Sequence, residues 1–238
     1  MSLKRMRQTT GILFLLGAML VNIPYTLLIM NFDYPDILRF PTGEILERFA
    51  AGGPSLIWTW LAFAWVGLPI LLGILLLPKA LGYESPAGQV ALFFGAAGAL
   101  VQMVGLLRWP FVVSVLAQLY TDPQASAGMQ EAVKAVFQAV HQYGGVVLGE
   151  HLGQIFTILW MILLSLSLLK NKAFPRWFSI AGIAASIVYV LAQGELLATA
   201  LPGFPVWDSA GLIGSLMWLV WMAVLGIILL RMKKETYE

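Results

Sequence analysis

Long apolar runs separated by short polar segments dominate the pattern along this chain. A helix needs about 20 mostly apolar residues to cross the hydrocarbon core of a bilayer. Six charge-poor runs reach that length, and we expect each to be a membrane-spanning helix: residues 10–31, 55–78, 86–107, 145–169, 177–198 and 209–230. The pattern therefore predicts an all-α fold, an integral membrane bundle of six transmembrane helices that forms one domain over residues 1–238.

The two longest segments between the runs carry helical patterns of their own. Residues 42–50 begin with Thr42, a candidate N-cap, followed by an acidic first turn, so a short helix is expected. Residues 125–143 alternate apolar and polar side chains at helical spacing. This is typical of an amphipathic helix that lies on the membrane surface or packs on the bundle. Both short helices are expected in outer loops.

Two further segments between the third and fourth runs need separate treatment. Residues 110–121 are apolar but too short to span, and three structures fit them: a re-entrant segment, an interfacial helix, or a kinked extension past Pro110. Gly144-Gly145 marks an expected break before the fourth run, because an unbroken helix over residues 125–169 would be about 67 Å long.

Basic residues are distributed unevenly between the loops. If the N-terminus is cytoplasmic, the outer side holds four of the 14 Lys and Arg residues and the inner side holds the other 10; the outer ones are Arg39, Arg48, Arg108 and Lys134. This positive-inside bias predicts a multi-pass membrane protein whose two termini are both cytoplasmic. Trp58, Trp109, Trp177 and Trp207 are expected in the aromatic belts at the two interfaces.

The amino-acid composition argues against several kinds of partner and binding site. The chain is 60% hydrophobic and 11% charged, and its net charge of +2 is too small to indicate a nucleic-acid partner. It has no cysteine, so disulfides and thiolate metal sites are excluded. The basic start resembles a signal peptide, but no A-x-A site follows, so we expect a retained helix. His141 and His151 lie ten residues apart and do not suggest a metal site, and we expect no cofactor.

The fourth run has distinct faces when drawn as an α-helix. Gly145, Gly149 and Gly153 repeat every four residues, a spacing that allows another helix to approach closely. Polar side chains fall beside this glycine stripe, and leucine and isoleucine fall on the far side, which we expect to face lipid: Leu148, Leu152, Ile155 and Leu159. On this helix Glu150 is expected to point into the bundle, and His151 falls at the edge of the polar arc.

Ionisable groups inside membrane helices are costly and mark functional sites by default. Glu150 and His151 lie early in the fourth run, Arg108 closes the third, and Glu195 lies near the outer end of the fifth. We predict one ligand-binding site formed by Arg108, Glu150, His151, Gln154 and Glu195 at outer-leaflet depth. Two alternatives remain open: Glu150 and Arg108 form a purely structural clasp, or the site carries out catalysis or transport.

Four stretches resemble a family of bacterial multi-pass membrane proteins labelled domain of unknown function 4386. They are FDYPDILRFPTGEILERFAAGG (32–53), LLRWPFVVSVLA (106–117), HQYGGVVLGEHLGQIFTILW (141–160) and FPRWFSIAGI (174–183). The resemblance implies a six-helix membrane protein and brings no activity, substrate or catalytic residue.

Three functions are therefore carried forward. The first is a non-enzymatic protein with an outward-facing polar pocket that binds a small molecule, a lipid or a partner. The second is an intramembrane enzyme that uses Glu150 as an acid or base on a lipid-like substrate. The third is a proton-linked transporter. We favour the first, because no nucleophile–base pairing or credible metal set accompanies Glu150.

Overall fold

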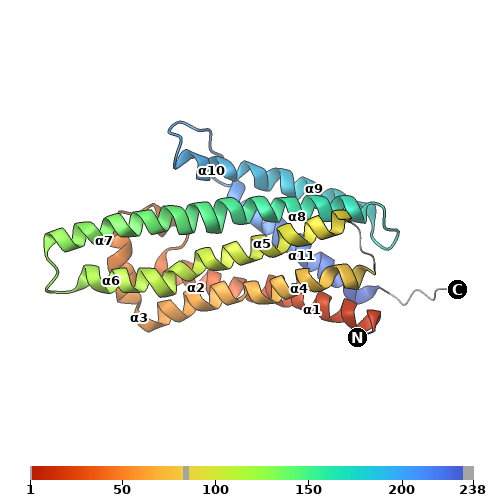
Figure 1. Cartoon of the computed structure of the whole chain (residues 1–238), viewed down its shortest axis with the longest axis horizontal. Helices are drawn as coiled ribbons and strands as arrows, with labels where there is room; N and C mark the ends of the chain where they lie inside the picture. The colour runs from red at the N-terminus through yellow and green to blue at the C-terminus, as the bar shows by residue number, and fades with distance from the viewer. Residues whose placement is uncertain (1, 83–85, 233–238) are drawn as a thin grey trace. The chain divides into compact units, whose positions relative to one another are not determined.

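The computed structural model describes residues 2–82 and 86–232, and every regular element in these residues is a helix (Figure 1). In chain order the elements are α1 (Leu3–Leu20), α2 (Asn22–Phe32), the 3₁₀-helix η1 (Asp36–Arg39), α3 (Thr42–Trp65), α4 (Gly67–Leu81), α5 (Pro86–Arg108), the π-helix η2 (Trp109–Val113), α6 (Ser114–Thr121), α7 (Ala127–Val140), the π-helix η3 (His141–Leu152), α8 (Gly153–Leu168), α9 (Arg176–Leu191), α10 (Gln193–Ala198) and α11 (Ala210–Arg231).

Six helical stretches within these residues are long and apolar enough to cross a membrane, which confirms the predicted fold class. They are Leu3–Phe32, Thr42–Leu81, Pro86–Thr121, Ala127–Leu168, Arg176–Ala198 and Ala210–Arg231. The second, third and fourth are much longer than a bilayer needs, because the helices predicted for the outer loops continue the spans instead of standing apart from them.

The chain folds into two compact units, each made of segments that are separated in the sequence. Unit 1 comprises residues 1–19, 67–100 and 151–238, and unit 2 comprises residues 20–66 and 101–150. The predicted single domain remains a prediction, and the two units are described separately below.

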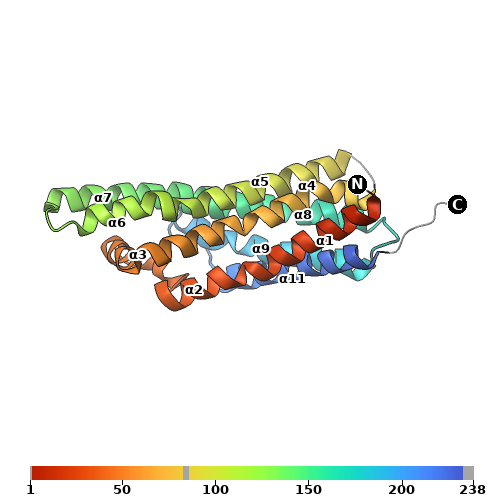
Figure 2. The ribbon, with the colours of Figure 1, turned by 90° about the horizontal axis from the view of Figure 1, so that it is seen from below.

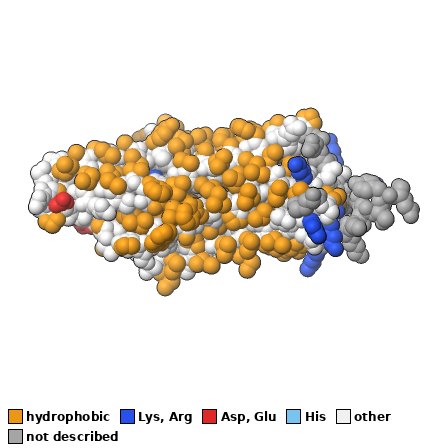
Figure 3. Space-filling view, turned by 60° about the horizontal axis from the view of Figure 1, so that its bottom comes forward, with side chains coloured by type: hydrophobic (Ala, Val, Ile, Leu, Met, Phe, Trp, Pro, Cys, Tyr) orange, Lys and Arg blue, Asp and Glu red, His pale blue; other side chains and the backbone are white. Residues whose placement is uncertain are grey.

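In unit 1, α9 packs between α8 and α11 (Figure 2). Their core contains the stacked rings of Phe178 and Trp221, whose centroids are 4.9 Å apart, and the Trp221 indole N–H donates to the Phe178 carbonyl over 3.0 Å. The start of α1 and the end of α11 lie at the same end of this unit (Figures 1 and 2). Lys and Arg side chains gather at that end, and hydrophobic side chains cover the flanks of the helices in the face that Figure 3 shows.

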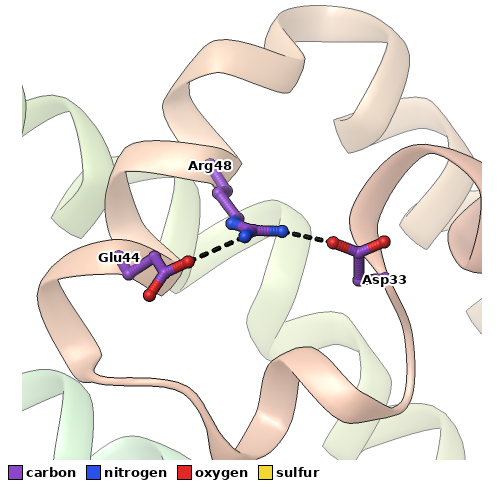
Figure 4. A network of polar contacts seen from close by, with 3 residues as sticks. All are labelled: Asp33, Glu44 and Arg48. Atoms are coloured by element: carbon purple, nitrogen blue, oxygen red, sulfur yellow. Dashed lines mark hydrogen bonds and ion pairs between the residues drawn. The ribbon is translucent and has the colours of Figure 1, made fainter.

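Unit 2 is built around α3, which packs against α2, α6, η2 and α7. Arg48 on α3 pairs with Asp33 in the preceding loop and with Glu44 one turn earlier, the latter over 2.7 Å (Figure 4). These contacts, together with the fully buried Ile37, hold the loop that carries Tyr34 and Arg39 against the unit.

The short helix predicted over residues 42–50 is present as the start of α3, with Glu44 in its first turn. Thr42 is not the cap, however. Pro41 occupies the N-cap position without a side-chain hydrogen bond, and Thr42 is already helical. The segment 110–121 takes the third of its three possible forms, a helical extension of α5 through η2 and α6. Proline lacks the N–H that an α-helix interior requires, which accounts for the local π-helical turn at Pro110.

The predicted break at Gly144-Gly145 is wrong. The helix runs without interruption from Ala127 to Leu168, and the glycines lie inside the π-helix η3. The amphipathic segment is therefore the first part of a long helix, and its Val133 and Phe137 are buried in the core of unit 2. Because a π-helix is wider than an α-helix, faces assigned on an α-helical wheel do not hold across this stretch. The leucines expected to face lipid, Leu148 and Leu152, are half-buried.

Candidate functional site

Arg108 ends α5 and is almost completely buried, with 8% of its surface exposed. Its Nη1 donates to the Gly105 carbonyl one turn earlier over 2.5 Å, and its guanidinium carbon lies 5.2 Å from the centroid of the Trp109 ring. The Nε atom is buried and has no hydrogen-bond partner among the residues that the structure describes. A buried guanidinium thus keeps one donor unused, which is uncommon because buried polar groups are nearly always paired.

The space for this guanidinium comes from the glycines of η3. A Cβ atom placed on Gly145 would lie 2.5 Å from Nη2 of Arg108 and 2.7 Å from its ζ carbon. Any side chain at position 145 would therefore displace Arg108. One turn further along, Gly149 meets Gly105 so closely that a Cβ atom on Gly149 would lie 3.1 Å from the Gly105 Cα. The predicted close contact at the glycine stripe is confirmed, and its partner is the end of α5.

Glu150 lies in η3, one residue beyond Gly149, and is half-buried. Its carboxylate lies within electrostatic range of the guanidinium groups of Arg108 and Arg39. The structure thus brings together Arg108 and Glu150, two of the five predicted site residues, on neighbouring helices of unit 2. Arg39, from the loop before α3, is an additional charged group that the sequence did not single out.

His141 begins η3 and lies against the aromatic core of unit 2. Its ring stacks on Phe137 with centroids 5.3 Å apart and an interplanar angle of 15°, and it lies 6.2 Å from the Trp109 ring in an edge contact. Its Nδ1 atom is buried, and none of the residues described here bonds to it. The sequence pattern placed His141 just before the fourth run and outside the predicted site. The sequence did contain one indication: His141 follows Phe137 by four residues, so both side chains lie on the same face of a helix.

Trp109 connects these groups to a larger aromatic cluster. Its ring stacks on Trp60 with centroids 4.6 Å apart and on Phe49 with centroids 5.7 Å apart, and Phe32 makes an edge contact at 5.5 Å. Trp60 and Trp109 are both fully buried. The prediction that Trp109 lies in an outer aromatic belt is therefore wrong, because its ring packs inside unit 2.

The other three predicted site residues belong to unit 1. His151 Nδ1 lies 2.7 Å from Gln193 Oε1, and Gln193 Nε2 donates to Gln154 Oε1 over 2.6 Å. An amide oxygen only accepts, so Nδ1 of His151 is the donor in this contact. Glu195 is half-buried on α10, two residues after Gln193. The structure thus links His151 and Gln154 through a residue, the buried Gln193, that the sequence pattern did not single out.

Gln193 offered a weak signal, since it is an uncharged polar residue in an apolar run. The predicted five-residue site therefore divides into Arg108 with Glu150 in unit 2, and His151, Gln154 and Glu195 in unit 1. That all five form one pocket remains a prediction.

Comparison with known families adds one finding. The family described as Domain of unknown function (DUF4386) matches residues 9–226. The chain belongs to this family. All five predicted site residues, and also His141 and Gln193, fall within the part that matches DUF4386. Neither the curated proteins nor the solved structures contain a match to this DUF4386 chain.

Proposed function

We propose that this DUF4386 protein is a non-enzymatic binding protein of the bacterial cell membrane, with both termini in the cytoplasm and a polar site that opens outward. The ligand is a small molecule or a lipid, and the site is centred on Arg108 and Glu150. One observation carries the proposal: Arg108 is buried in a membrane-spanning helix and keeps a buried Nε–H without a partner in the described part of the chain.

The alternative, that Arg108 and Glu150 only hold the helices together, accounts less well for the unpaired Nε–H of Arg108. Such a structural pair stabilises a fold when both partners have their hydrogen bonds satisfied, because each unmade bond of a buried group costs free energy. Arg108 uses Nη1 on a backbone carbonyl of its own helix and has the Trp109 ring beside its guanidinium carbon. The surplus donor is what an acceptor on a bound molecule would use.

The residues around Arg108 also favour ligand binding over an enzymatic reaction. The groups around Arg108 include Gly105, Trp109, Gly145, the Glu150 carboxylate and the Tyr34 phenol. An arginine next to one carboxylate can hold and orient a ligand. Covalent catalysis would in addition need a nucleophile positioned beside a base.

The test compares purified wild-type protein with Arg108→Gln, Glu150→Gln and the control Lys134→Gln by native mass spectrometry after incubation with a membrane-lipid extract. Lys134 belongs to an exposed ion pair with Glu131 in the same unit. We expect wild type and the control to retain a bound non-protein mass that both site variants lose while remaining folded. If Arg108→Gln does not fold, Glu150→Gln decides the comparison.

Two outcomes would overturn the proposal. Retention of the same mass by folded Arg108→Gln and Glu150→Gln would mean that these residues form only a clasp. Turnover of any lipid in the extract that disappears in Glu150→Gln would replace binding by an acid–base reaction.

A further inference from the structure

Unit 2 contains four buried polar side-chain atoms that have no hydrogen-bond partner in residues 2–82 and 86–232. They are Trp60 Nε1, Arg108 Nε, Trp109 Nε1 and His141 Nδ1. Native proteins leave few buried polar atoms unpaired, and each such atom calls for a specific explanation. The described residues contain eight such atoms, and these four are distinguished by gathering around one ring, that of Trp109.

The four side chains are neighbours around Trp109. Trp60 stacks on the Trp109 ring at 4.6 Å, the Arg108 ζ carbon lies 5.2 Å from it, and the His141 ring centre lies 6.2 Å away. The atoms come from three separate segments of the chain, since Trp60 is on α3, Arg108 and Trp109 are at the junction of α5 and η2, and His141 begins η3. The fold itself therefore gathers them.

Three of these four atoms can only donate. An indole nitrogen and a guanidinium nitrogen carry hydrogens and have no acceptor capacity, whereas His141 Nδ1 takes either role according to its tautomer. Three unpaired donors require an acceptor, and a group with several oxygen lone pairs satisfies such a set best. Another donor, such as an ammonium group, would leave all three unpaired.

The guanidinium of Arg108 favours an acceptor that is anionic. Arg108 is buried and is one of the donors of this set. A hydrogen bond from a guanidinium to an ionised oxygen is shorter and stronger than one to a neutral acceptor. An oxyanion would therefore satisfy this donor better than a neutral oxygen.

We infer that the ligand of this site carries an oxyanion, a carboxylate or a phosphate, whose oxygens accept hydrogen bonds from the Trp60, Arg108 and Trp109 N–H groups. The inference rests on the proposed binding function and adds the chemical class of the ligand. A lipid headgroup and a free anion share this chemistry, and the experiment below separates them.

Helix α3, which carries Trp60, has a kink at Gly53. Gly53 has φ 54° and ψ −152°, a conformation essentially restricted to glycine, and no atom lies within 4 Å of a Cβ built on it. The kink separates Phe49, which stacks on one side of the cluster, from Trp60.

The experiment measures binding to protein reconstituted in phosphatidylcholine nanodiscs, using isothermal titration calorimetry. The probes are inorganic phosphate, a long-chain fatty acid, the fatty alcohol of the same length, and phosphatidic acid added to the nanodisc lipid. The variants Trp60→Phe and Trp109→Phe keep a stacking ring but remove the N–H group. Trp58→Phe is the matched control, because Trp58 lies on the same helix with 64% of its surface exposed.

We expect the fatty acid or phosphatidic acid to bind wild type and Trp58→Phe, and each buried tryptophan variant to bind about tenfold more weakly. Tight binding of inorganic phosphate alone would still support an oxyanion site and would assign it to a free anion. Equal binding of fatty acid and fatty alcohol would overturn the oxyanion inference and leave the binding function intact. Absence of binding for every probe, with a bound mass still dependent on Arg108, would likewise reject only the inference.

Discussion

Arg108 is held by three kinds of contact, and each comes from a different part of unit 2. A backbone carbonyl accepts from Nη1, an aromatic ring lies beside the guanidinium, and a carboxylate on η3 acts on its charge. Removing the side chain would leave the Glu150 carboxylate without its nearest buried cation. The two residues therefore contribute to stability as a pair as well as to the proposed site.

We predict that Arg108→Ala destabilises the protein in detergent by about 1–3 kcal/mol, the typical cost of leaving a buried polar group without its partner. Arg108→Ala combined with Glu150→Gln should recover part of the loss, because the unpaired carboxylate is then neutral. Thermal melts of the single variants, the double variant and Lys134→Ala as a surface control measure both effects. If Arg108→Ala melts at the wild-type temperature, the Arg108 and Glu150 pair does not contribute to the stability of the fold.

The sequence predicted Arg108 and Glu150 because charges inside or at the ends of apolar runs stand out. It did not predict His141, Trp60 or Gln193. Aromatic and amide side chains are common in membrane spans, and only the tertiary fold shows which of them meet. Trp60 and Trp109 are 49 positions apart in the chain (109 − 60), and no local pattern signals that their rings stack at 4.6 Å.

At the scale of elements, the crossing of α5 and η3 depends on backbone atoms in direct contact. A Cβ atom on Gly105 would lie 2.9 Å from the Gly144 carbonyl oxygen and 3.0 Å from the Gly149 nitrogen. Backbone atoms cannot rotate away as side chains can, so the two helices would have to separate.

We predict that Gly105→Ala lowers the melting temperature, although alanine normally favours a helix over glycine by roughly 0.5–1 kcal/mol. Gly211→Ala is the matched control, because a Cβ atom on Gly211 at the start of α11 meets nothing within 4 Å. That variant should be as stable as wild type or more stable. Equal stability of the two variants would mean that the close crossing is absent in the membrane.

The existence of the six spans was predictable from run length alone, whereas their ends were not. Gly144 and Gly145 looked like a break because glycine weakens an isolated helix. In the structure they remain helical because the absent side chains make room for Arg108 and for α5. The cost of a glycine is visible in the sequence, but the packing that offsets this cost is not.

At the scale of the whole molecule, the topology follows from the six spans and the distribution of charge. An even number of spans returns the chain to its starting side, and α1 begins at the end of unit 1 where α11 finishes (Figures 1 and 2). The loop between α8 and α9 carries Lys170 and Lys172, and the loop between α6 and α7 carries Asp122. The positive-inside bias favours a cytoplasmic position for the loop between α8 and α9, in line with the proposed orientation.

We predict that, in intact cells, a membrane-impermeant thiol reagent labels Gln124→Cys but not Lys172→Cys, and that permeabilisation allows labelling of both. The chain contains no cysteine, so each variant reports a single position. Labelling of Lys172→Cys alone in intact cells would reverse the orientation and place the Arg108 site on the cytoplasmic side.

The central claim is that unit 2 holds a ligand whose oxygens meet the unused donors around Trp109. The most direct test is an experimental structure of the wild-type protein purified in native membrane lipid. We predict non-protein density within about 3 Å of Arg108 Nε and of at least one of the two indole nitrogens, Trp60 or Trp109. A map in which these donors are all paired with protein atoms, with no other density beside them, would contradict the claim.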